Sequence, residues 1–196
     1  ILDSTIQLVL CRQERGGTFM ADGAARVSGK AGVVLVTSGP GATNTITGIL
    51  TAQMDSVPMV VITGQTITAN LGLDAFQEAD VLGMSLAATK WSYQVTDPNE
   101  VGWAVAEAVS IAASGRPGPV LIDITKDAQV GMVTKPRSGI AWPTTAPNVS
   151  HRDVTSVNEK LEPFEKAIAR AASLLDHSDR PLILAGHGIL IAGAEN

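Results

Sequence analysis

The fold is decided by one stretch, VVLVTSGPGATN at residues 33–44. Its first five residues form a short apolar run rich in β-branched side chains, which is typical of a buried strand, and Gly39, Pro40 and Gly41 end that run. Glycine allows unusual backbone angles and a close approach to a ligand, and the N–H groups of a following helix start can receive an anion. The stretch predicts a strand, a turn and a helix, although a tight turn without a ligand would use the same residues.

Strand and helix patterns alternate on both sides of this stretch. We expect further strands at residues 8–11, 58–63 and 119–124, and helices at 17–28, 42–55 and 99–114. Continuous apolar strands that alternate with helices are typical of a parallel sheet whose two faces are covered. The predicted fold class is therefore α/β, with a mostly parallel sheet flanked by helices.

The composition changes after Gln129. Residues 130–160 contain three prolines among many Ser, Thr and Asn residues, which is typical of a linker. An amphipathic helix at residues 162–177 and a strand at 182–185 then begin a new unit. We predict one domain at residues 1–130, a linker at 131–160 and the truncated start of a second domain at 161–196.

The bulk properties exclude several classes of protein. The net charge of −5, with no basic stripe, argues against nucleic-acid binding, and no apolar run approaches the ~20 residues of a membrane span. The single cysteine, Cys11, follows an apolar run, so we predict a small buried thiol in a reducing compartment and a cytoplasmic protein. The three histidines lack metal-ligand spacing, so no metal site is predicted.

Glu14 is the strongest candidate for chemistry. It lies where an apolar run gives way to a helical pattern, and such junctions meet at the carboxyl edge of a sheet, where α/β folds bind ligands. The alternative is a charge that only complements the helix dipole. Other polar residues near predicted strand ends, taken singly, are more often caps or solvated charges: Gln65, Gln77, Arg116 and Lys126.

As an ordered series, nine motifs in residues 12–129 resemble the large subunits of acetolactate synthases. They lie at residues 12–17, 21–30, 37–44, 54–58, 62–65, 74–78, 89–91, 114–120 and 123–129. The resemblance implies a pyrimidine-binding domain for thiamine diphosphate at residues 1–130 and, from residue 161, the start of a Rossmann-like central domain. It also implies Mg²⁺, with ligands outside these residues, and FAD, which many members keep.

The resemblance also implies roles for individual residues. Glu14 matches the glutamate that contacts N1′ of the cofactor pyrimidine and shares a proton with it, and Gln77 matches a second residue of the catalytic wall. The remaining matches are a cofactor loop, a substrate channel and a FAD contact: Gly39, Pro40, Gly41, Asn44 and Gln65 for the cofactor, Phe76 and Lys126 for the channel, and Arg116 for FAD.

The implied reaction is decarboxylation of pyruvate and addition of the two-carbon unit to a second 2-keto acid. This forms 2-acetolactate in branched-chain amino-acid biosynthesis, in a homodimer or homotetramer with a possible regulatory small subunit. We expect residues 1–196 alone to be inactive. The alternatives are another thiamine-diphosphate-dependent 2-keto-acid decarboxylase or carboligase, such as a sulfoacetaldehyde acetyltransferase-like enzyme, and a non-catalytic module that keeps the fold.

Two departures from the family pattern bear on these alternatives. Gln13 stands where the family has histidine, and residues 66–69 (TITA) replace a Val-Pro pair followed by basic or polar residues. In the family the second segment lines the substrate channel. Its change affects the expected substrate and leaves the expected cofactor as it was.

Overall fold

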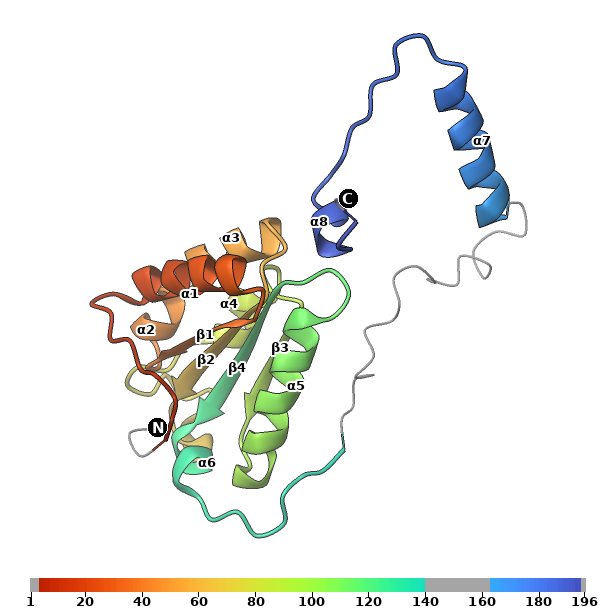
Figure 1. The fold of residues 1–196 in the computed structure, drawn as a ribbon. Coiled ribbons are helices and arrows are strands. Elements are labelled where there is room, and N and C mark those ends of the chain that lie inside the picture. Colours follow the sequence, from red (N-terminus) through yellow and green to blue (C-terminus); the bar gives the residue numbers. More distant parts are fainter. Residues whose placement is uncertain (1–3, 140–162, 195–196) are drawn as a thin grey trace. The chain divides into compact units, whose positions relative to one another are not determined.

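The computed structural model describes residues 4–139 and 163–194, and the chain divides into two compact units, Ile1–Pro147 and Asn148–Asn196. The first unit contains a four-stranded sheet (Figure 1). Its strands are β1 (Gly32–Val36), β2 (Met59–Gln65), β3 (Trp91–Val95) and β4 (Pro119–Thr125), in the order β1-β2-β4-β3. Every pair is parallel, which confirms the predicted fold class.

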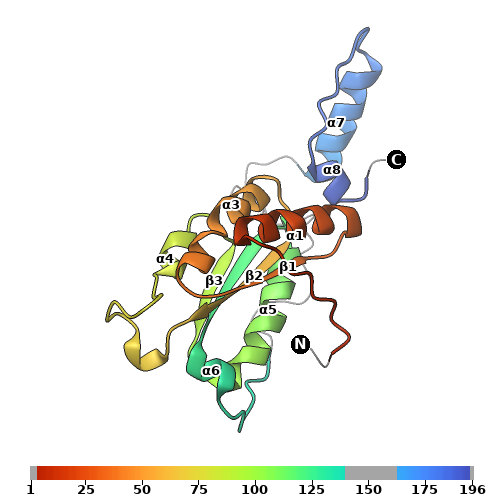
Figure 2. The same ribbon diagram turned by 90° about the vertical axis from the view of Figure 1, so that its left-hand side faces the viewer.

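Helices cover both faces of this sheet (Figure 2). On one face, α1 (Glu14–Ser28), α3 (Ile46–Met54) and α4 (Val81–Ser85) pack on the alternate strand residues that include Val61 and Leu121. On the other face, α5 (Val101–Ala113) packs its alanines on Val60, Val120 and Ile122. Small helical side chains allow the close packing that buries β4 along its whole length.

Several short elements connect these layers. They are α2 (Pro40–Thr43), α6 (Lys126–Val130) and two 3₁₀ turns at Thr68–Asn70 and Pro98–Glu100. Because the strands are parallel, their carboxyl ends and the starts of the following helices lie at one edge of the sheet, and the helix ends lie at the opposite edge. We call these the carboxyl edge and the amino edge.

The strand predicted at residues 8–11 is wrong. These residues are irregular and exposed, with Leu10 at 92% exposure. An apolar run becomes a strand only where a neighbouring strand accepts its hydrogen bonds, and no described strand pairs with this segment. Cys11 is correspondingly exposed, so the prediction of a buried thiol is also wrong.

Two further elements differ from the sequence patterns. The helix predicted at residues 42–55 is divided into α2 and α3, and at the division the backbone N–H and the hydroxyl of the buried Thr45 both donate to the Ala42 carbonyl, the hydroxyl at 2.6 Å. Strand β3 has no continuous apolar run and was not predicted. Stacking of Trp91 on Tyr93 at 5.3 Å and packing of Trp103 from α5 stabilise it instead.

The second unit contains α7 (Phe164–Asp176) and α8 (Gly188–Ile191). The strand predicted at residues 182–185 is wrong: this segment has no strand partner among the described residues, and Leu184 is 90% exposed. The boundary between the units falls between Pro147 and Asn148, within residues 140–162, which lie outside the described structure. The linker assigned to residues 131–160 stays a prediction.

The described part of that predicted linker, residues 131–139, contacts the first unit. Asn99 Oδ1 accepts hydrogen bonds from the backbone N–H groups of Thr134 and Lys135. The Arg137 guanidinium lies 3.5 Å from the centre of the Trp103 ring and pairs with Glu100 at 2.7 Å. This segment is thus held against α5 and the 3₁₀ turn at Pro98–Glu100.

Candidate active site at the carboxyl edge of the sheet

Glu14 is the first residue of α1 and is half-buried at the carboxyl edge. The preceding residue, Gln13, supplies the helix cap, because its side-chain oxygen accepts the Gly16 N–H at 3.3 Å. Gln13 therefore performs a structural task in the position where the family has histidine. With this cap supplied, the carboxylate of Glu14 is available for other contacts.

Those contacts come from the turn between β1 and α3. Asn44 Nδ2 donates to Glu14 Oε2 at 3.0 Å across thirty positions of sequence. A methyl group placed on Gly41 would lie 3.5 Å from Glu14 Oε1 and only 2.6 Å from Thr37 Cγ2. A side chain at Gly41 would therefore collide with Thr37, so the turn that passes Oε1 requires glycine at this position.

A pocket of about 780 Å³ lies at the same edge. It brings together four residues that the sequence assigned to one site, namely Gln65, Phe76, Gln77 and Lys126. Glu14 and Asn44 are not among its lining residues, but Thr37 lines it and also borders the space at Gly41. A volume of this size is within the range of ligand sites, roughly 300–1,000 Å³.

Gly39 is required by the loop that carries Phe76 and Gln77. Its φ is +55°, and a Cβ there would lie 2.7 Å from the Gln77 carbonyl oxygen. Gln77 itself has a φ of +57°, an uncommon conformation for a residue with a side chain. The wall of the pocket is therefore held in a strained shape by direct backbone contact with the glycine turn.

Glu78 supports the same loop from within. Its carboxylate accepts backbone N–H groups from Gly72 and, at 2.9 Å, from Ala75. These bonds to the ionised form hold the pKa of Glu78 below its ordinary value. Phe76 projects from this loop with 90% of its surface exposed.

Gln65 belongs to a buried polar cluster. Its amide nitrogen donates to Asp123 Oδ2 at 3.0 Å and to the Ala79 carbonyl at 2.9 Å, while its oxygen accepts the Thr66 N–H. Asp123 is fully buried and also accepts from Thr63 at 2.6 Å and Gln94 at 3.1 Å. Burial raises the pKa of Asp123, while its three donors act in the opposite direction.

The altered segment at residues 66–69 forms part of the pocket wall through Thr66 and Ile67. Thr68 anchors it, because its backbone N–H and its hydroxyl both donate to Asp127 Oδ1 at 3.1 Å. Bonds from neighbouring threonines, Thr125 first, lower the pKa of Asp127 to about 2. Lys126 begins α6 beside this anchor and is exposed.

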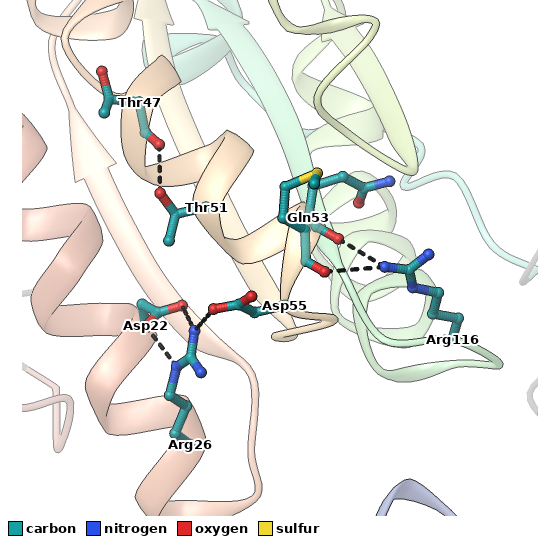
Figure 3. A network of polar contacts seen from close by, with 8 residues as sticks. Asp22, Arg26, Thr47, Thr51, Gln53, Asp55 and Arg116 are labelled. Carbon is teal, nitrogen blue, oxygen red and sulfur yellow. Dashed lines mark hydrogen bonds and ion pairs between the residues drawn. The ribbon is translucent and has the colours of Figure 1, made fainter. Parts of the chain in front are cut away.

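Arg116 lies at the amino edge, away from the residues above. Its guanidinium donates to Ser56 Oγ at 2.7 Å. It also donates to the carbonyls of Gln53 and Met54 at 3.3 and 3.1 Å, at the end of α3 (Figure 3). In the described structure it stabilises a helix terminus. Its predicted contact with FAD stays a prediction.

Sequence reasoning missed the roles of Asp123, Glu78 and Thr37. Asp123 had a visible signal, since a carboxylate inside an apolar strand must find donors or neutralise. The contact of Thr37 with Gly41 had none, because it depends on how the turn folds. No group of three or more His, Cys, Asp or Glu side chains that could hold a metal ion occurs in residues 4–139 and 163–194.

Comparison with known proteins agrees with this geometry. Residues 1–84 match the family "Thiamine pyrophosphate enzyme, N-terminal TPP binding domain". The chain is 47% identical over 191 residues to the acetolactate synthase large subunit of Parasynechococcus marenigrum, covering 97% of this chain and 30% of that protein. It is 43% identical to the acetolactate synthase isozyme 2 large subunit of Escherichia coli, covering 99% and 33%. With the mitochondrial catalytic subunit of Aspergillus candidus it shares 44% identity, covering 97% and 27%.

Residues 1–84 are therefore similar to the N-terminal TPP-binding domain of the thiamine pyrophosphate enzymes. Over nearly its whole length the chain is similar to the large or catalytic subunits of acetolactate synthases. It spans about a third of the length of the curated relatives it matches.

The residues at the carboxyl edge fit the pyrimidine end of thiamine diphosphate. A ring nitrogen needs a carboxyl partner, and Glu14 offers Oε1, which lies beside the side-chain-free Gly41. The other oxygen is already engaged by Asn44. Within the described residues, no helix is long and apolar enough to cross a membrane.

Proposed function

We propose that this chain serves a thiamine-diphosphate-dependent carboligase that joins pyruvate to a second 2-keto acid and forms 2-acetolactate. The observation that carries the proposal is the environment of Glu14, a half-buried carboxylate with one oxygen bonded to Asn44 and the other beside the backbone of Gly41. The identity of 43–47% with acetolactate synthases supports the choice of reaction. The cited relatives are about three to four times as long as this chain, so the activity is proposed for the complete protein.

In this proposal Glu14 holds a proton at Oε1 and exchanges it with N1′ of the pyrimidine. When bound, thiamine diphosphate supplies a thiazolium carbon that serves as the nucleophile toward the keto acid. Phe76 and Lys126 border the substrate's approach, and Gln77 presents its amide at the pocket. Gln65 contributes by holding β2 to Asp123, so its part in cofactor binding is support of the pocket floor.

The further components are also proposals. Mg²⁺ would be bound by residues outside this chain, and the assembly would be a homodimer or homotetramer in the cytoplasm. Relatives named "large subunit" motivate a regulatory small subunit. A FAD contact by Arg116 would lie at the amino edge, opposite to Glu14, and would use a guanidinium that already holds the end of α3.

Glu14→Gln in the complete protein tests the proposal. The amide is nearly isosteric, but it does not readily exchange a proton, so we expect exchange of the C2 proton of bound thiamine diphosphate to slow about 10²–10⁴-fold. A charge that only complements the dipole of α1 predicts instead a loss of about 0.3–1 kcal/mol of stability with unchanged exchange. Quenched-flow NMR of the exchange, together with thermal unfolding, separates these results.

Another keto-acid enzyme of the same cofactor class is the second candidate. The observation that favours it is the altered segment 66–69, since Thr66 and Ile67 line the pocket in which a substrate would lie. Product analysis with pyruvate alone, and with pyruvate plus 2-ketobutyrate, decides between them. Acetaldehyde without acetolactate would support a decarboxylase.

A further inference from the structure

Asn44 and Glu14 come from two separate strand-to-helix connections. Glu14 begins α1, and Asn44 is the C-cap residue that follows the short helix α2. The backbone N–H of Asn44 donates to the Pro40 carbonyl at 3.1 Å, which fixes the turn that carries its side chain. The amide is thus presented to Glu14 Oε2, 3.0 Å away, from a defined backbone position.

This contact makes the two carboxylate oxygens of Glu14 different. Oε2 accepts a hydrogen bond from an amide, which does not exchange its proton on a catalytic timescale. Oε1 lies beside the backbone of Gly41, since a Cβ placed on that glycine would come within 3.5 Å of it. Any proton that Glu14 exchanges with a ligand is thereby directed to Oε1.

Helix capping does not account for the arrangement. Gln13 caps α1 through the Gly16 N–H, and the described hydrogen bond of the Glu14 side chain goes to Asn44. A glutamate side chain has three rotatable bonds, and holding it in one rotamer before the ligand arrives reduces the entropy lost on binding. Misplacing a reacting group by about 1 Å can cost about 10²-fold in rate.

We propose that Asn44 is a positioning residue that acts through Glu14 and not as a direct ligand of the cofactor. This inference rests on the proposed function of Glu14. Asn44 fixes the rotamer of the glutamate and reserves Oε1 for proton exchange with the pyrimidine ring. The two residues form one functional unit even though thirty positions separate them.

A double-substitution cycle in the complete protein tests the unit, with Asn44→Ala, Glu14→Ala and the double variant. We expect Asn44→Ala alone to slow C2 proton exchange of bound thiamine diphosphate about 10- to 100-fold. In the Glu14→Ala background the same substitution should change exchange less than about twofold, because the group on which it acts is gone. Asn44→Ser, whose hydroxyl is too short to replace the amide, serves as a second variant if alanine impairs folding.

Two measurements independent of turnover accompany the cycle. The dissociation constant of thiamine diphosphate should be equal, within about twofold, with and without Asn44 in the Glu14→Ala background. In the cofactor-free protein, the shift in the urea midpoint of the double variant should differ from the sum of the shifts of the two single variants. A direct ligand would instead weaken cofactor binding by the same factor in both backgrounds.

The outcomes separate the two proposals. If Glu14→Gln leaves exchange unchanged, the proposed function of Glu14 is wrong. If Glu14→Gln slows exchange but Asn44→Ala does not, or slows it equally in both backgrounds, the positioning role is overturned and the function of Glu14 stands.

Discussion

The two edges of the sheet differ in how their charged side chains are used. The amino edge collects helix ends, and three cations lie there: Arg26, Lys90 and Arg116. The carboxyl edge collects helix starts, and acidic side chains lie there: Glu14, Asp80 and Asp127. Both distributions complement the helix dipoles.

The difference lies in what remains after the helix termini are satisfied. At the amino edge, Arg116 donates to carbonyls at the end of α3, and Arg26 pairs with Asp55, which follows that helix (Figure 3). Lys90 donates to a carbonyl at the end of α5. At the carboxyl edge, Gln13 caps α1, and the Glu14 carboxylate is bonded to Asn44 beside the backbone of Gly41. Because α1 is already capped by Gln13, the charge of Glu14 is available for a ligand, and we expect the ligand chemistry at the carboxyl edge.

The buried cluster at the carboxyl edge should give the largest stability effect. Asp123→Ala leaves the donors of Thr63, Gln65 and Gln94 without their acceptor in a dry site, at about 1–3 kcal/mol for each unsatisfied group. We expect the free energy of unfolding to fall by about 3 kcal/mol. Equilibrium urea unfolding followed by tryptophan fluorescence measures it, and a loss below about 1 kcal/mol would contradict the role of the cluster.

The same carboxylate has a predicted pH dependence. Burial raises the folded-state pKa of Asp123 above the ordinary aspartate value of about 3.9, so the folded chain binds this proton more readily than the unfolded chain. Its contribution to the free energy of unfolding is therefore complete below that ordinary value and is lost as the pH rises through the raised pKa. Asp123→Asn should remove this component. The free energy of unfolding of the unsubstituted chain, relative to that of the variant, should therefore fall as the pH rises through the raised pKa.

The glycine turn should give the next largest effect. Gly39→Ala places a Cβ at positive φ and against the Gln77 backbone, and we expect a loss of about 2 kcal/mol together with a disturbed pocket loop. Gly102→Ala is the matched control, because Gly102 is exposed in α5 with open space around it, and it should stabilise by about 0.5–1 kcal/mol. Equal effects of the two substitutions in urea unfolding would refute the close approach at Gly39.

At the amino edge, Lys90→Met should have a moderate effect. The half-buried ammonium donates to the Ile111 carbonyl and, at 2.7 Å, to that of Ser114, at the end of α5. Desolvation lowers the pKa of Lys90, so the cost of burying its charge offsets part of the stability that these hydrogen bonds contribute. We expect a loss of about 1 kcal/mol. Lys30→Met on the exposed surface is the control and should stay within about 0.5 kcal/mol.

The smallest effect should come from Arg26→Gln. Arg26 pairs at 2.7 Å with Asp22 and with Asp55, but its side chain and that of Asp55 are about half exposed. Exposed pairs contribute roughly 0.2–1 kcal/mol and are screened by salt. The difference from the unsubstituted chain should shrink between 0.05 and about 0.5 M NaCl. A difference that does not change with salt would mean that packing of the side-chain stem dominates.

Local patterns were sufficient for much of the fold. The run at residues 33–36 and the glycines at 39 and 41 specify a strand and a turn through short-range sterics, and β1 and α2 form there. Glu14 could be singled out because a junction between an apolar run and a helix predicts a position at the carboxyl edge, where α/β sheets bind ligands. The helical part of that junction is present, whereas its strand is not.

Only tertiary structure decided the elements and contacts that need a partner from elsewhere in the chain. Residues 8–11 and 182–185 have the composition of strands, yet a strand also requires a neighbour to receive its hydrogen bonds, and none of the described strands provides one. The acceptor role of Asp123 depends on the register that sets it opposite Thr63 and Gln94. The contact of Asn44 with Glu14 likewise depends on two connections meeting at one edge of the sheet. Short-range sterics act within a few residues, whereas these contacts exist only after the strands have paired.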